Sequence, residues 1–348
     1  MEGELQFGLE SMEQKLESLF HNSQIDTGEI IDHILQGELT GALKVITDSI
    51  AEAFYANLDE VRLIFVSLLL LGVTGAVCVR FSELFEKYHL GELSFYFIYL
   101  SQAMILMKTY YALSLKAEET LCNILVFIKL LCPTYLMAVA ASTGTVTAGA
   151  GYEMVLMLIY GVEELFRGIL LPMVRVFFLI TLLNGICLPK RLDFVTGLIK
   201  TGIVWVMRGT IGILGGIELL QGILTPTLDG IQEGVIRRAV KVIPGVGNSA
   251  EGIIEITLGC SGALKNCMGV LLPVFLLLLC AIPLFKLLLF AFVLKFAAAF
   301  VELIGSRDMA VAIDQTGETS LLLFKIVGCA MLLFMSVITV TCVSLKRF

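Results

Sequence analysis

The sequence predicts a polytopic α-helical membrane protein with about nine spans (seven to nine), some of them broken or re-entrant. Hydrophobic residues make up 57% of the 348 residues and charged residues only 16%, whereas soluble domains are about 45–50% apolar and about 25% charged. Apolar runs of roughly 17–23 residues recur, which matches the bilayer core at about 1.5 Å per residue. Runs such as VFLLLLCAIPLFKLLLFAFVL (residues 274–294) do not alternate polar and apolar positions, which excludes a transmembrane β-barrel.

Residues 1–58 predict a short acidic, amphipathic helical region in front of a membrane domain at 59–348. The first 60 residues hold 13 acidic residues and two lysines, so the net charge of −7 mainly describes this region. Asp26 and Glu29 have the spacing of a capping box, and apolar residues follow at helical spacing. Two interpretations stay open: a helical cap on the membrane domain, or an arm that docks a partner.

Nine apolar segments follow in order. The pair at 152–188 carries Glu163, Glu164 and Arg167 at its centre, so a re-entrant hairpin or one bent helix are alternatives to two spans. The predicted segments are Leu63–Val79, Leu93–Leu113, Leu121–Ser142, Tyr152–Phe166, Gly168–Leu188, Val195–Leu224, Met268–Leu284, Phe285–Ile304 and Leu321–Val343.

The positions of Lys and Arg in short loops predict the orientation, because these residues accumulate on the cytoplasmic side. Basic residues follow the first span and the fifth span and end the chain at Lys346 and Arg347. With nine spans, all three groups lie inside if the N-terminus is outside. An outside start is typical of a precursor with a cleaved signal peptide, although MEGE at residues 1–4 lacks the features of one.

A polar stretch at 225–267 interrupts the apolar body. Residues around Ile231–Ile243 form an amphipathic helical pattern that ends at Pro244 and Gly245, and Asn248 begins a second helix through about Asn266. Irregular chain at membrane depth must be enclosed by protein or line a water-filled cavity. The stretch is therefore either an interfacial hairpin or a segment that enters a polar cavity. Its candidate cavity or partner-contact residues are Asp229, Glu233, Arg237, Arg238, Lys241, Pro244, Lys265 and Asn266.

Ionisable residues also occur within the predicted spans, where they are functional candidates by default. Lys286 and Lys325 are expected to extend from helix ends toward water. Lys200 and Arg208 are eight residues apart on one helix and are the strongest candidates for a cavity. Small residues on the same helix predict close helix packing: Gly209, Gly212, Gly215 and Gly216. The other charged residues in or near apolar runs are Lys129, Glu163, Arg175, Glu218 and Lys295.

Enzymatic motifs are almost absent. The chain has no P-loop, no His-Glu-x-x-His and no Cys-x-x-Cys. The stretch at 259–262, GCSG, resembles the motif of intramembrane serine proteases, but Ser261 needs a base and the three histidines precede the second predicted span. We therefore predict no enzyme, no catalytic residue, no cofactor, no metal and no nucleic-acid partner.

Six short motifs resemble the stage III sporulation protein AE family of endospore-forming bacteria. They are LPKRLD (188–193), LIKTGIVW (198–205), LQGILTPTLDG (220–230), RAVKVIPGVG (238–247), GC (259–260) and KNCMG (265–269). The resemblance covers residues 170–306 well and the remainder by length and hydropathy.

This resemblance implies a subunit of the channel that joins the mother cell to the forespore, in the mother-cell-derived membrane around the forespore. The implied partners are the other membrane and ring-forming proteins of the same operon, including a separate secretion-type ATPase. The chain is also expected to contact the lipid bilayer. Assembly with further copies of itself stays open. The resemblance also implies a role as a permease or export gate. The alternative is an autonomous secondary transporter for a small anionic solute, bound by Lys200 and Arg208.

Overall fold

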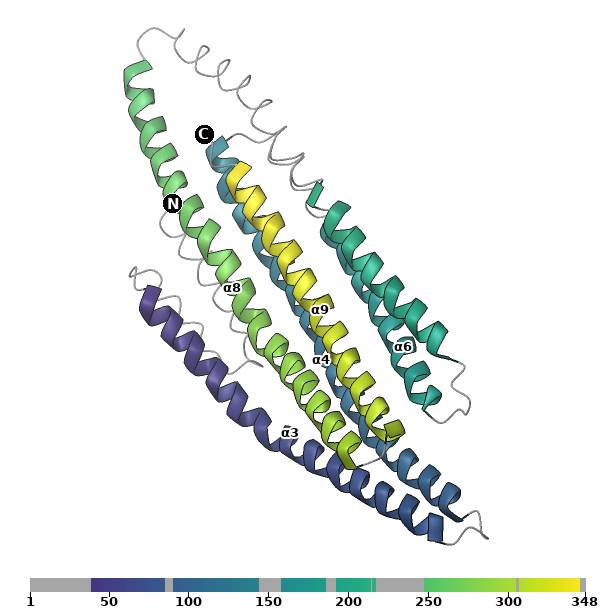
Figure 1. The fold of residues 1–348 in the computed structure, drawn as a ribbon. Helices are drawn as coiled ribbons and strands as arrows, with labels where there is room; N and C mark the ends of the chain where they lie inside the picture. The colour runs from purple at the N-terminus through teal and green to yellow at the C-terminus, as the bar shows by residue number, and fades with distance from the viewer. Residues whose placement is uncertain are drawn as a thin grey trace.

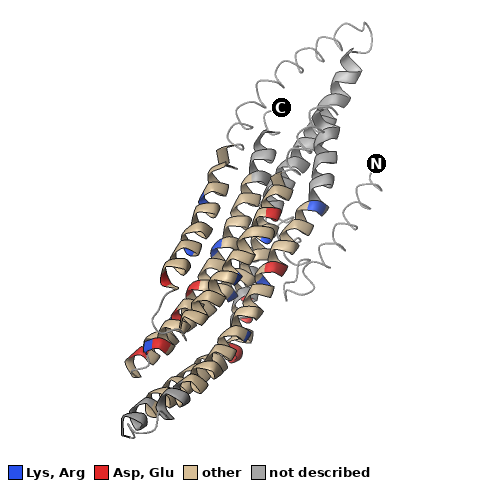
Figure 2. Cartoon of the chain, turned by 90° about the vertical axis from the view of Figure 1, so that its right-hand side faces the viewer, with Lys and Arg blue, Asp and Glu red and all other residues tan. Residues whose placement is uncertain are grey.

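The computed structural model describes residues 39–84, 90–143, 158–185, 192–213, 215–216, 247–304 and 307–344. Within these residues every regular element is a helix and no strand occurs, so the predicted all-helical class is confirmed. Figure 2 shows that most of the described ribbon is uncharged, with basic and acidic residues scattered along the helices.

Four long helices lie side by side (Figure 1) and form the body of the molecule. They are α3 (Leu39–Leu84), α4 (Leu90–Thr143), α8 (Gly247–Ile304) and α9 (Arg307–Ser344). α8 packs mainly on α9 and also contacts α3 and α4. At 58 residues α8 is about 87 Å long, and α4 at 54 residues is about 81 Å long. Both therefore exceed the ~30 Å hydrocarbon core of a bilayer.

Two further helices form a hairpin beside α9 and α4 (Figure 1). The first, Leu158–Asn184, contains the π-helical turn η1 (Glu164–Leu170) and then α6 (Leu171–Asn184). The second is Asp193–Ile213. The Asn184 amide donates to the Asp193 carboxylate, and the Leu192 backbone N–H donates to the Asn184 side-chain oxygen at 3.2 Å. These bonds join the end of the first helix to the start of the second.

Five of the described helices are long and apolar enough to cross a membrane. They are Tyr55–Cys78, Leu158–Asn184, Asp193–Ile213, Pro273–Ile304 and Arg307–Ser336. The membrane-protein class is supported, whereas the count of nine is not confirmed. Within the pair predicted at 152–188, the described residues Leu158–Asn184 form one helix that contains a π turn, and not two spans. The helix Leu158–Asn184 ends four residues before the predicted end at Leu188. The predicted end at Leu224 lies outside the described residues.

The predicted breaks inside α4 and α8 are wrong. Residues 113–121 were expected to connect two spans, but α4 continues through them. Their Leu, Lys, Ala and Glu residues favour helix, and Lys116 pairs with Glu119 one turn away at 3.1 Å. Residues 284 and 285 likewise lie within α8, which accommodates both Pro273 and Pro283. The charged residues that we read as a loop therefore belong to a helix that continues beyond bilayer length.

The predicted second helix of the polar stretch is correct at its start and wrong at its end. α8 begins at Gly247, beside the predicted cap at Asn248, but it does not end near Asn266. No proline lies between residues 245 and 272 to stop it. Residues 217–246, which include the first predicted helix of this stretch, lie outside the described residues.

The core lies where α3, α4, α6, α8 and α9 meet. Large side chains in it are fully buried, and α4 also buries several polar side chains: Gln102, Thr109, Ser114 and Thr120. The Gln102 amide nitrogen donates to the Met309 carbonyl at 2.8 Å, and the Tyr99 hydroxyl donates to the Leu182 carbonyl at 2.9 Å. Polar groups on α4 thus join it to α9 and to α6.

α3 approaches α8 closely at Gly72. A methyl carbon placed on Gly72 would lie 2.8 Å from the Cγ2 atom of Val301, which is closer than two carbon atoms normally pack. A side chain at residue 72 would therefore force α3 away from α8.

Candidate functional site

A polar stretch within α9 forms the centre of the candidate site. Residues 314–320 read DQTGETS, and they lie inside the apolar helix Arg307–Ser336. The hydroxyl of Thr316 donates to the Ala312 carbonyl at 2.9 Å, and that of Thr319 donates to the Gln315 carbonyl at 2.8 Å. The Ser320 hydroxyl instead donates across to the Leu287 carbonyl on α8 at 2.8 Å. The hydroxyl groups are thereby bonded, as an apolar environment requires.

Gly317 lets α8 and α9 approach closely in the middle of this stretch. A methyl carbon placed on Gly317 would lie 3.2 Å from the Ala291 carbonyl oxygen and 3.3 Å from the Leu294 Cβ atom, both on α8. The same carbon would lie 3.2 Å from the Cγ atom of Lys295. The absence of a side chain at residue 317 therefore brings Lys295 beside the acidic residues of α9.

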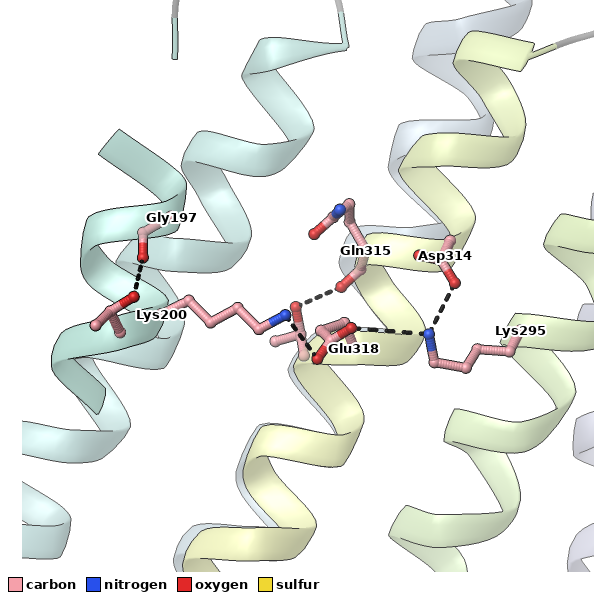
Figure 3. A network of polar contacts seen from close by, with 8 residues as sticks. Gly197, Lys200, Lys295, Asp314, Gln315 and Glu318 are labelled. Atoms are coloured by element: carbon pink, nitrogen blue, oxygen red, sulfur yellow. Dashed lines mark hydrogen bonds and ion pairs between the residues drawn. The ribbon is translucent and has the colours of Figure 1, made fainter. Parts of the chain in front are cut away.

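Four charged side chains from three helices form a continuous ion-pair network (Figure 3). Lys200 Nζ of the helix Asp193–Ile213 lies 3.0 Å from Glu318 Oε1. Lys295 Nζ of α8 lies 2.8 Å from Asp314 Oδ1 and 3.8 Å from Glu318 Oε2. Asp314 and Glu318 are four residues apart, so both carboxylates lie on the same face of α9.

The network balances two positive and two negative charges. Glu318 is its most enclosed member, with a side chain 20% exposed, whereas the Lys200 side chain is 42% exposed. Charged groups in an apolar bundle are expensive unless they are paired, and they commonly mark pathways for ions or polar solutes. We name Lys200, Lys295, Asp314 and Glu318 the central network.

Among the sequence-predicted site residues, the structure brings only Lys200 into the central network. Arg208 lies on the same helix, is exposed, and makes no ion pair with any described residue. Lys265 and Asn266 are residues of α8, and the structure describes their backbone but not their side chains. The remaining predicted residues lie outside the described residues: Asp229, Glu233, Arg237, Arg238, Lys241 and Pro244.

The four glycines predicted for helix packing have no close neighbour in the described chain. A methyl carbon placed on Gly209, Gly212, Gly215 or Gly216 would meet no atom within 4 Å. Close helix packing at these four glycines therefore stays a prediction. Its packing partner would have to be a segment outside the described residues or another protein chain.

Other predicted intramembrane charges make separate contacts. Lys286 of α8 pairs with Glu60 of α3 at 3.1 Å, so this lysine joins two helices, whereas we expected it to extend to water. Lys129 lies 4.5 Å from the centre of the Tyr160 ring, a cation–π contact. Within η1, Arg167 lies 3.4 Å from Glu118 of α4 and 3.9 Å from Glu163, which precedes the turn.

Sequence reasoning missed Asp314 and Glu318 because it began the last span at Leu321. A usable signal was present, since apolar and small residues continue at helical spacing before that point. The buried positions of α9 include Met309, Ala312, Ile313 and Thr316. Extending the 3.6-residue period toward the N-terminus would have placed both carboxylates inside the helix.

The arrangement does not resemble a metal centre. Within the described residues, no group of three or more His, Cys, Asp or Glu side chains could hold a metal ion. Each carboxylate of the central network has a lysine partner within 3.0 Å. The network can hold helices together, and it can exchange ion-pair partners.

Comparison with known proteins identifies the family. The family model described as stage III sporulation protein AE matches residues 25–344. A relative named stage III sporulation protein AE from Bacillus subtilis (strain 168) is 21% identical over 278 residues, which cover 79% of this chain and 69% of that protein. No solved structure matches the chain. Because the family model spans nearly the whole sequence, including all six described membrane-domain helices and the central network, the chain belongs to the stage III sporulation protein AE family.

Proposed function

We propose that this chain is a non-enzymatic membrane subunit of the channel or secretion-like complex that links the mother cell to the forespore. The family name refers to a stage of sporulation and not to a catalysed reaction. Five apolar helices fit a membrane component. The observation that carries the proposal is the central network, because paired, partly buried charges between apolar helices suit a conduit for polar solutes.

Within this complex the chain takes a permease or export-gate role and supports late forespore development. It lies in the mother-cell-derived membrane around the forespore, with the N-terminus outside and the C-terminus in the cytoplasm. Energy comes from a separate secretion-type ATPase, since the sequence has no P-loop. The other membrane and ring-forming proteins of the same operon are its partners.

Deletion of the gene in its native host tests this proposal. We expect engulfment to be completed and forespore development to arrest afterwards, so that heat-resistant spores fall to background and the intact gene restores them. Affinity purification of the tagged full-length chain from sporulating cells should recover the ATPase and the ring-forming proteins. Normal spore yield in the deletion strain would contradict the proposal.

The alternative of an autonomous secondary transporter required Lys200 and Arg208 to bind an anion together. Lys200 instead has Glu318 as its partner at 3.0 Å, so the first proposal is favoured. Uptake of a small anion by vesicles that contain only the purified chain would reverse this preference.

A further inference from the structure

We infer that a passage for small hydrophilic solutes opens between the helix Asp193–Ile213 and α9, and that the Lys200–Glu318 ion pair holds this passage closed. The inference rests on the proposed permease role and specifies where the gate lies.

The helix Asp193–Ile213 is the least enclosed of the described candidate spans. Only 11% of its apolar window is buried inside the molecule, against 50% for Pro273–Ile304 and 56% for Arg307–Ser336. Ile203 is its fully buried hydrophobic residue, while Phe194, Leu198 and Trp205 are exposed. Because van der Waals packing against neighbouring helices is what holds a helix in a membrane bundle, this sparsely packed helix is the easiest of these spans to move.

The two sides of α9 are held in different ways. On the α8 side, Gly317 allows close backbone approach, Ser320 bonds to the Leu287 carbonyl, and Lys295 pairs with Asp314. On the other side, Lys200 reaches α9 through its long side chain and pairs with Glu318 (Figure 3). α8 and α9 therefore form the fixed wall, and the helix Asp193–Ile213 forms the movable one.

Glu318 has a second lysine available when Lys200 leaves. Lys295 Nζ lies 3.8 Å from the other Glu318 oxygen, so a small adjustment gives Glu318 a full ion pair with α8. The costly outcome of an unpaired carboxylate in an apolar bundle is thereby avoided. Glu318 therefore keeps a lysine partner when the Lys200–Glu318 ion pair opens. A reversible gate needs this property.

The open state would present polar groups on both walls. Lys200 would project from the movable helix, while Asp314, Glu318 and Lys295 would remain on the fixed wall. A water-filled passage tolerates these charges and a lipid-filled one does not. The solutes that fit are therefore small, hydrophilic molecules or ions.

Dye release from vesicles tests the gate. The purified full-length chain is reconstituted in phosphatidylcholine vesicles that contain carboxyfluorescein, and release is compared for the wild type, K200M, K200R and R208Q. K200M removes the ion pair and should speed release about twofold to fivefold, the size expected for loss of one partly exposed ion pair. K200R keeps the charge, and R208Q removes an exposed charge on the same helix that pairs with no described residue, so both should retain the dye like the wild type.

E318Q provides a second variant, because it breaks the same pair from the α9 side while Lys295 keeps Asp314. It should also speed release, and each variant is first required to elute as the wild type does in size-exclusion chromatography. Equal release from K200M, E318Q and wild type would overturn the gate even if deletion of the gene still blocks spore formation. Faster release from R208Q as well would overturn it too, since the effect would not be specific to the ion pair.

Discussion

At the scale of single residues, close contacts and hydrogen bonds decide how the helices fit together. The Tyr99 hydroxyl reaches from α4 to the Leu182 carbonyl of α6, and Tyr110 stacks on Phe178 with ring centres 4.0 Å apart. Both contacts lie between helices that are distant in the sequence. Small changes at such positions should therefore affect the bundle as a whole.

Replacing Tyr99 with Phe tests the bond between α4 and α6. The change removes one hydrogen bond in a buried environment, and we expect a loss of about 1 kcal/mol in the free energy of unfolding. The matched control is Y111F on the same helix, because the Tyr111 side chain is 63% exposed. Thermal unfolding in detergent measures both, and equal melting temperatures for the two variants would refute the expectation.

Replacing Gly317 with Val tests the close approach of α8 and α9. The new side chain would overlap Ala291 and Leu294, and we expect about 1–3 kcal/mol of destabilisation. G328V on the same helix is the control, since a methyl carbon on Gly328 would have its nearest contact at 3.8 Å from Leu284. A melting temperature of G317V at or above that of G328V would show that the close approach of α8 and α9 at Gly317 does not make a larger side chain there destabilising.

At the scale of helices, the chain departs from simple bilayer spans because its helices continue beyond the apolar segments. α8 starts at Gly247 and includes polar residues such as Asn248, Glu251 and Lys265 ahead of its long apolar segment. The π turn Glu164–Leu170 interrupts the regular hydrogen bonding of the helix Leu158–Asn184, and it contains Arg167, which pairs with Glu118 and Glu163. Such turns are often found at functional sites.

The polar stretch before α8 supplies a prediction at this scale. Reversing the charges of Arg237, Arg238 and Lys241 together should impair sporulation after engulfment, because these residues are expected to face water or a partner. The amount of protein in the membrane fraction should not change. Heat-resistant spore counts and immunoblots measure the two quantities, and wild-type spore counts would argue that these charges have no role in the complex.

At the scale of the whole molecule, the described part is an elongated bundle of long helices (Figure 1). α8 at about 87 Å and α4 at about 81 Å are each more than twice the thickness of the hydrocarbon core. An untilted helix of this length would extend outside the bilayer. Such extensions would offer contact surfaces to other subunits of a complex.

Orientation is testable at the same scale. Basic residues at Lys346 and Arg347 and in the short loops predict a cytoplasmic C-terminus and an outside N-terminus. Alkaline phosphatase, which is active only outside the cytoplasm, should be active when fused to the N-terminus and inactive when fused after Phe348. The reverse activities would contradict the predicted orientation.

The sequence by itself determined the membrane class, the helical content and the family, because composition, apolar length and short motifs are local properties. It also identified Lys200 as a candidate, since a charge within an apolar run is visible without a fold. The tertiary structure decided what Lys200 contacts: the helix packing brought together Lys200, Lys295 and Glu318, which are far apart in the sequence. It also decided where helices end, because tertiary packing and helix propensity kept polar stretches such as 113–121 and 314–320 helical, where hydropathy alone predicted loops.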